Sequence, residues 1–341
     1  MELIRKTAYA RAGLVGNPSD GYHGKTISLV VRNFSAEVTL YEWDQIELVW
    51  SQEDRSRFRS IRELVEDVDL HGYYGGIRLV KATVKKFAEY CMRRGHALHD
   101  RNFSVRYQSS IPRQVGLAGS SAIIVATLRC LMGFYQAEIP REVQPSLALA
   151  VETEELGIAA GLQDRVIQVY EGLVYMDFAK DRMAEKHGLL CGAYEPLDPA
   201  LLPPLYVAYS TQWGKPTEHV HGDLRARYNR AEPAVVEAMG RFADLTVQAR
   251  QAILARDAAR LAQLIDGNFD LRRSILRLPP RLIEMIERAR RTGASAGFTG
   301  SGGAIIGTCP DEATFRRLCA ELEPLQCRVI RPQVLPEDPT V

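Results

Sequence analysis

Two segments carry apolar side chains at the spacing of one helix face. In residues 77–94, and again in a segment beginning near residue 235, apolar residues recur every three or four positions, which predicts two amphipathic helices. A third helix is predicted over 280–293, with Gly293 as its stop. The apolar positions of the first helix are Val80, Val84, Phe87 and Cys91, and its expected outward positions are Lys81, Lys85, Lys86 and Glu89; those of the second are Val235, Met239, Phe242, Leu245 and Ala249.

Other segments alternate apolar and polar residues, which is the pattern of half-buried strands. "NFSVRYQ" (102–108) has this alternation, and "KTISLVVRNFSAEVTLY" (25–41) is strand-like over its whole length. The C-terminal part predicts a strand at 303–309, a helix capped by Asp311, and a strand at 327–334. Because strands and helices are mixed without strict alternation, we expect an α+β fold.

A proline-rich stretch around residues 197–210 separates the two halves of the pattern. It leads into a new strand, so we expect a boundary between a domain of residues 1–200 and a domain of residues 201–341. The chain has 341 residues and is 46% hydrophobic, which is long enough for two cores.

Charge and composition exclude several classes of partner. The chain carries 43 Lys and Arg against 42 Asp and Glu, so no long-range field favours nucleic acid or a membrane surface. No uncharged apolar run approaches the ~18 residues that span a bilayer, and the N-terminal residues do not have the pattern of a signal peptide. The six cysteines are scattered, which favours reduced thiols and a cytoplasmic location. The pattern leaves the oligomeric state open.

The segment "RQVGLAGSSAII" (113–124) combines a glycine loop with the start of an apolar helix. The first N–H groups of a helix lack partners, and the helix dipole adds partial positive charge. Glycines let a phosphate approach the backbone, and serine hydroxyls bind oxygen or Mg²⁺. An anion site and a plain turn with Ser120 as N-cap both fit this segment. It is not a Walker A loop, because no Lys follows the last glycine.

An acidic segment, "AVETEELGIAAGLQDRVIQVYEG" (150–172), holds four carboxylates within thirteen residues. Glutamates on such a helix usually form a solvated face, which is our expectation for Glu154 and Glu155. Asp164 differs, because it follows Gly161 among apolar neighbours, where a lone charge needs a partner or a task.

Two further glycine segments, "ARAGLVGNPSDGYHGKTIS" (10–28) and "GFTGSGGAIIG" (297–307), flank the serine loop in sequence order. Together the three resemble the signature segments of the GHMP kinase superfamily, the relatives of galactokinase and mevalonate kinase. The correspondence covers nearly the whole chain. "GYYGGIRL", the serine loop and "ELGIAAGLQDRVIQVYEGLVYMDF" are most similar to plant-type glucuronokinases.

The resemblance implies a two-domain kinase with ATP in the cleft between its domains. It assigns Asp164 as the catalytic aspartate and Glu152 as the Mg²⁺ ligand together with Ser121 or Ser120. The serine loop is one residue longer than the commonest family form, which leaves the choice of serine open. Arg11 is expected beside Asp164 and the transferred phosphate, or else as a surface arginine beside a strand. The expected contacts of the ATP phosphates are Gly116, Leu117, Ala118, Gly119, Ser120, Ser121 and Gly302.

Departures from the galactokinase pattern point to a sugar acid. Asn17 stands where that pattern has an acidic residue, and Arg165 stands where it has Gln. Removing a negative charge and adding a guanidinium suits a sugar carboxylate. Pairing of Arg165 with Asp164 or Glu155 is the alternative.

Further residues are expected on the substrate side. The resemblance assigns Asp20 to the substrate hydroxyls, against a turn aspartate. Arg113 is a further candidate for carboxylate or phosphate. Tyr73 and Tyr74 are expected to stack on the sugar or the base, or to pack at a helix start. Near a helix end, Asn268, Arg272 and Arg273 form either a substrate contact or a solvated basic turn.

The resemblance therefore implies phosphorylation of the anomeric hydroxyl of D-glucuronate by Mg-ATP. A kinase for galacturonate or a neutral hexose is the first alternative. A sugar- and ATP-binding sensor without turnover is the second, and the presence of both Glu152 and Asp164 argues against it.

Overall fold

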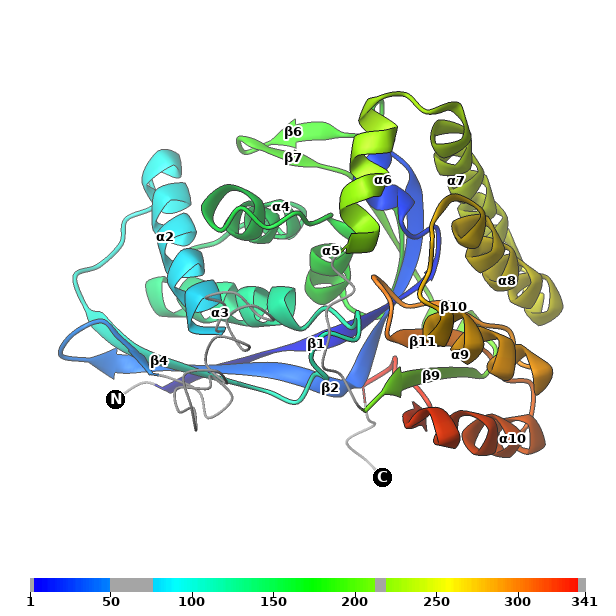
Figure 1. The fold of residues 1–341 in the computed structure, drawn as a ribbon. Coiled ribbons are helices and arrows are strands. Elements are labelled where there is room, and N and C mark those ends of the chain that lie inside the picture. Colours follow the sequence, from blue (N-terminus) through cyan, green and yellow to red (C-terminus); the bar gives the residue numbers. More distant parts are fainter. Residues whose placement is uncertain (1–2, 50–75, 212–218, 337–341) are drawn as a thin grey trace, which may run out of the picture.

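The computed structural model describes residues 3–49, 76–211 and 219–336, with the backbone alone for 219–223. The chain forms two β-sheets with helices packed on both (Figure 1). This arrangement confirms the expected α+β class.

The larger sheet is built around the long antiparallel pair of β1 and β2. Its strand order is β3-β4-β2-β5-β8, with β1 alongside β2. β2 alternates between partners along its length, pairing with β5 over Lys25–Leu29 and with β4 over Ala36–Trp43. The strands are β1 (Leu3–Val15), β2 (Lys25–Trp43), β3 (Glu47–Val49), β4 (Asn102–Ser109), β5 (Leu173–Asp177) and β8 (Ala193–Leu197). A separate hairpin joins β6 (Ala184–Lys186) and β7 (Leu189–Cys191).

In Figure 1 the helices of residues 76–170 lie over one face of the larger sheet, and one of them, α3, contacts both β1 and β2. The predicted helix at 77–94 is confirmed as α2, which buries Phe87 and Cys91. Lys86 was expected in solvent and is instead buried, because its ammonium group pairs with Glu154 at 3.0 Å and Glu89 at 3.2 Å. The four helices are α2 (Gly76–Arg94), α3 (Gly119–Tyr135), α4 (Gln144–Ala150) and α5 (Gln163–Tyr170).

The smaller sheet has the order β10-β11-β9-β12, and all of its pairs are antiparallel. The strand, helix and strand predicted for the C-terminal part are confirmed as β11, α10 and β12. Asp311 caps α10 by accepting from the Thr314 amide at 2.7 Å. The strands are β9 (Leu205–Ser210), β10 (Gly297–Phe298), β11 (Ala304–Thr308) and β12 (Cys327–Ile330). The helices of this half are α6 (His219–Asn229), α7 (Pro233–Leu254), α8 (Ala258–Ile275), α9 (Pro280–Arg291) and α10 (Glu312–Leu322), and short 3₁₀ turns lie at Ser19–Tyr22, Pro199–Leu201 and Glu323–Leu325.

The two sheets share apolar contacts. One buried cluster contains Ala12 and Val31 from the larger sheet together with Val207 and Ala304 from the smaller one. The larger sheet ends at Leu197 and the smaller begins at Leu205. The division into domains of residues 1–200 and 201–341 stays a prediction.

Candidate active site

The three glycine segments that are far apart in sequence meet at the end of β1. The Arg11 amide donates to the Leu117 carbonyl at 3.1 Å, and the Gly13 amide donates to the Thr299 carbonyl at 2.8 Å. The loops that contain Gly116 and Gly302 touch directly, since a Cβ on Gly116 would lie 3.0 Å from the Gly302 carbonyl oxygen. Any larger side chain there would push the loops apart.

The serine loop enters α3 through backbone that favours glycine. Gly116 has φ +75° and Ala118 has φ +62°, and the helix begins at Gly119. The Ala118 carbonyl accepts from Gln168 Nε2 at 2.7 Å, which fixes the loop against α5. The Leu117 side chain is buried in the core, so this residue offers a ligand only its backbone. The first amides of a helix have no partner within the helix, so the start of α3 offers donors just after Gly116, which touches the loop of Gly302.

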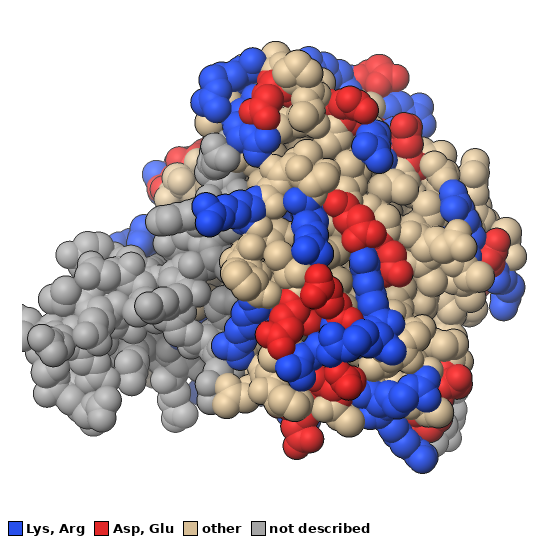
Figure 2. Space-filling model, turned by 45° about the vertical axis from the view of Figure 1, so that its right-hand side comes forward, with Lys and Arg blue, Asp and Glu red and all other residues tan. Residues whose placement is uncertain are grey.

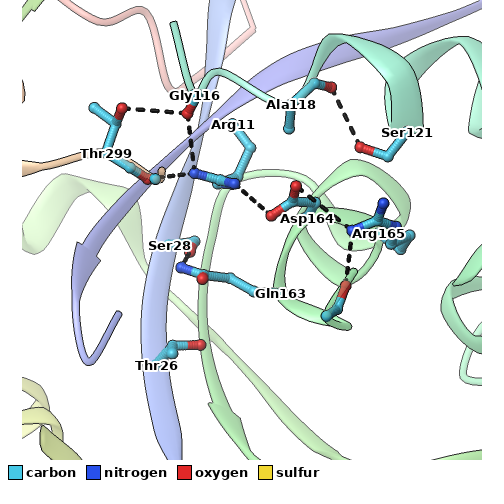
Figure 3. Close-up of polar contacts among 12 residues, drawn as sticks. Arg11, Thr26, Ser28, Gly116, Ala118, Ser121, Gln163, Asp164, Arg165 and Thr299 are labelled. Atoms are coloured by element: carbon cyan, nitrogen blue, oxygen red, sulfur yellow. Dashed lines mark hydrogen bonds and ion pairs between the residues drawn. The ribbon is translucent and has the colours of Figure 1, made fainter. Parts of the chain in front are cut away.

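Arg11 joins the two loops to the acidic helix (Figure 3). Its guanidinium donates to the carbonyls of Gly116 and Thr299 and pairs with the Asp164 carboxylate. The side chain is 4% exposed, so the surface-arginine alternative is wrong. Thr299 belongs to the glycine segment 297–307 that the sequence singled out, but a backbone acceptor leaves no side-chain pattern that would mark this residue itself.

Asp164 and Glu152 lie on either side of Arg165. Asp164 is in the first turn of α5, and Glu152 is in η2 (Val151–Glu155), a π-helical turn that follows α4 directly. The Arg165 guanidinium pairs with the Glu152 carboxylate, lies 3.5 Å from Asp164 Oδ2, and donates to the Gly161 carbonyl at 2.7 Å. Glu152 is 1% exposed. Arg165 was expected to bind the carboxylate of the sugar. In this structure its guanidinium instead pairs with the two acids of the site.

The remaining acids of this segment pair with lysines of α2. Glu155 pairs with Lys85, and Glu154 pairs with Lys86. Of the two alternative partners proposed for Arg165, Asp164 is confirmed at 3.5 Å, whereas Glu155 pairs with Lys85. The solvated-face interpretation holds for Glu154, whose side chain is 60% exposed.

The two serines of the loop point in different directions. Ser121, the first choice as metal ligand, is fully buried and donates to the Ala118 carbonyl at 3.3 Å. The Ser120 hydroxyl donates to Glu152 Oε1 at 3.0 Å. The structure therefore places Ser120, and not Ser121, against the acidic group.

Asp20 approaches the catalytic candidates from the turn after β1. A Cβ on Gly161 would lie 2.2 Å from Asp20 Oδ2, so the two residues are in close contact. The pKa of Asp20 is raised from 3.8 to about 6, chiefly by burial and then by the negative charge of Asp164, while the positive charge of Arg11 acts against both. Asp20 therefore lies in the same charged group as Asp164 and Arg11.

Asn17 and Gln163 line the neighbouring part of the site. Asn17 is buried, and its carbonyl accepts from Asn268 Nδ2 at 3.2 Å. Gln163, which the sequence did not single out, is 2% exposed and donates to Ser28 Oγ at 2.6 Å. Gln163 precedes Asp164 in the helix, and only this adjacency signals it in the sequence.

Three predicted site residues are not among the contacts described above. Arg113 is exposed in the turn before α3. Tyr73 and Tyr74 lie outside the described residues. Among the residues that the structure describes, no three His, Cys, Asp or Glu side chains form a metal-binding group, so a metal here would need the ligands of a bound molecule.

On the face shown in Figure 2, basic and acidic side chains are interspersed and form no large patch of one sign. None of the helices in the described stretches has the length and apolar character that crossing a membrane requires.

The chain is similar to proteins of a known family. Residues 78–172 match the family described as GHMP kinases N terminal domain, and residues 249–326 match GHMP kinases C terminal. Glucuronokinase 1 of Arabidopsis thaliana is 42% identical over 331 residues, which cover 95% of this chain and 89% of the relative. Probable glucuronokinase 2 of the same plant is 43% identical over 333 residues, covering 96% and 88%.

Solved structures agree on the fold. Lactococcus lactis galactokinase complexed with galactose matches with a TM-score of 0.75 at 13% identity, over 98% of this chain and 94% of that one. The sequence identity to the plant enzymes extends over nearly the full length and includes both family domains. The chain therefore belongs to the GHMP kinase family.

Proposed function

We propose that the protein is an ATP-dependent kinase that phosphorylates the anomeric hydroxyl of D-glucuronate, giving glucuronate 1-phosphate and ADP. The observation that carries this proposal is the pairing of Asp164 with Arg11 at the junction of the two glycine loops. The identity to plant glucuronokinases over 95% of the chain supports the choice of sugar.

Asp164 acts on the sugar hydroxyl. It accepts the proton as the sugar oxygen forms its bond to the γ-phosphorus and the bond from phosphorus to the β-phosphate oxygen breaks. Arg11, held by two carbonyls, orients this carboxylate and places positive charge beside the transferred group. Positioning and charge provide most of the catalysis in such reactions.

The ATP phosphates bind the backbone amides of residues 116–121 and the loop of Gly302. The donor set at the mouth of α3 fits Mg²⁺: Ser120 Oγ and Glu152 Oε1 lie 3.0 Å apart, and the ion prefers few carboxylates together with phosphate oxygens and water. When bound, Mg²⁺ neutralises charge on the phosphates. We assign Ser120 and Glu152 as its protein ligands, in place of Ser121.

On the sugar side, Asp20 accepts hydrogen bonds from substrate hydroxyls. Its contact with Gly161 and its closeness to Asp164 put it within reach of a sugar whose anomeric hydroxyl faces Asp164. Asn17 lies next to this position and carries no charge that would repel a carboxylate.

The test is ADP release with Mg-ATP against glucuronate, galacturonate, galactose, glucose and mevalonate. We expect strong turnover with glucuronate, and a decrease in kcat of about 10²–10⁴-fold in Asp164→Asn. ATP affinity of this variant should stay near that of the wild type.

The other outcomes are equally informative. Turnover with a neutral sugar alone would contradict the proposed substrate and keep the phosphoryl chemistry. ATP binding without turnover of any of these compounds would favour the sensor alternative. An Asp164→Asn variant of unchanged kcat would contradict the catalytic assignment.

A further inference from the structure

Arg272 is a buried arginine with an unused pair of donors. It lies near the end of α8, is 1% exposed, and donates through Nη1 to the Gly300 carbonyl at 2.8 Å. Its Nε and Nη2 are shielded from solvent and have no hydrogen-bond partner. The ring of Phe298 lies 5.1 Å from its guanidinium carbon. A buried guanidinium is costly unless its donors are used.

The two unused donors form one edge of the guanidinium. The N–H bonds of Nε and Nη2 point the same way, and together they match the two oxygens of a carboxylate in a bidentate pair. Gly300 occupies only the opposite side of the group. The geometry therefore suits a carboxylate better than a hydroxyl or a single carbonyl.

The surroundings place Arg272 on the substrate side of the site. One helical turn before Arg272, Asn268 donates to the Asn17 carbonyl at 3.2 Å and accepts from the Gly16 amide at 2.8 Å. Gly300 follows Thr299, whose carbonyl holds Arg11. In Figure 1, α8 lies beside β10, which leads into this loop, and the two elements are in contact.

The charges nearby leave Arg272 available. Burial lowers its pKa to about 10, and Asp20 is the charged neighbour that acts against this change. The described part of the chain has no carboxylate within ion-pair distance of this guanidinium. Arg165, which the sequence suggested for this role, already pairs with Glu152 and lies close to Asp164.

We propose that Arg272 is the residue that recognises the carboxylate of the sugar acid, through Nε and Nη2. This inference rests on the proposed function and names the group that selects a uronic acid over a neutral sugar.

The experiment compares glucuronate with glucuronamide, which has the same ring and a neutral carboxamide in place of the carboxylate. The affinity for each is measured calorimetrically without nucleotide, and kcat and KM are measured with Mg-ATP. We expect the wild type to prefer glucuronate by about 100-fold, the range for a buried charged hydrogen-bonded pair. In Arg272→Met the preference falls to about onefold, mainly through KM.

Two further variants separate recognition from folding. Arg272→Lys keeps the charge and loses the bidentate edge, so its preference should be about tenfold. Arg273→Met is the matched control: this neighbour is exposed, pairs with Glu287 at 3.0 Å, and should keep the full preference. If Arg272→Met does not fold, Arg272→Lys carries the test.

The outcomes distinguish this inference from the proposed function. A wild type that binds no uronic acid contradicts both. A wild type that prefers glucuronate, with the same preference in the Arg272 variants, overturns the inference alone. Equal weakening of both compounds in Arg272→Met would also overturn it, because it would show that the side chain only supports the loop at Gly300.

Discussion

Two buried arginines lie in the two halves of the site, and their surroundings differ. Arg165 lies on the phosphate side, 3% exposed, between the carboxylates of Glu152 and Asp164. Arg272 lies on the sugar side and is 1% exposed. It donates to one backbone carbonyl, and two of its nitrogens have no hydrogen-bond partner. The first arginine is compensated by the fold itself. The second is a charge that the ligand-free chain leaves uncompensated, as expected for a group held ready for a partner.

The largest predicted difference is in the stability of the ligand-free protein. Arg165→Met leaves Glu152 buried without its cation and should lower the free energy of unfolding by about 3–5 kcal/mol. Arg272→Met removes a charge that has no anionic partner and should change it by less than about 1 kcal/mol, or raise it. Urea unfolding without ligands measures both. An equal decrease in the free energy of unfolding of the two variants would contradict the difference proposed between Arg165 and Arg272.

A second prediction concerns the pH dependence of the sugar side. The pKa of Asp20 is about 6 in the folded protein and 3.8 in the unfolded one, so its protonated form favours folding. Its contribution is full below pH 4 and is lost as the pH rises through 6. Asp20→Asn should therefore match the wild type at pH 4 and exceed its free energy of unfolding by up to about 3 kcal/mol at pH 7.5.

Unfolding curves from pH 4 to 8 test this for the wild type and the variant. If the free energy of unfolding of Asp20→Asn depends on pH in the same way as that of the wild type, another titrating group causes the dependence. The sugar side would then not be the half of the site where a buried charge lowers stability.

The smallest predicted effect concerns the contact between the two halves. Gly161→Ala introduces a Cβ that would lie 2.2 Å from Asp20 Oδ2, so Asp20 must shift. Such overpacking costs about 1–3 kcal/mol. We expect an effect at the lower end of this range, which corresponds to a roughly tenfold increase in the KM for the sugar, with the KM for ATP unchanged. Gly240→Ala is the control, since its Cβ would meet nothing within 4 Å. An equal increase in both KM values would contradict a role confined to the sugar side.

Patterns within one segment predicted most of the fold. The helix period found α2 and α7, the alternation found β4, and Asp311 marked the start of α10, because each depends only on neighbours along the chain. The family resemblance, which the comparisons confirm, came from the order of the glycine segments.

Contacts between distant segments were not predictable in the same way. Lys86 is buried because Glu154 lies opposite it, 68 positions away. Arg165 pairs with Glu152 because η2 turns that acid inward, and the choice between Ser120 and Ser121 depends on which hydroxyl α3 presents to it. For Arg272 and Arg273 the sequence offered both a substrate contact and a solvated turn. The structure buries the first and exposes the second.

The position of Glu152 in the site depends on the number of residues in the π-helical turn at Val151–Glu155. An α-helix advances by about 100° per residue, so inserting or deleting one residue within the turn would rotate Glu152 away from Ser120 and Arg165. π-turns of this kind arise from a single extra residue within a helix. The same change in the loop before Gln144 would be absorbed without moving the acid. Related chains are therefore expected to tolerate substitutions around Glu152 more readily than a change in the number of residues.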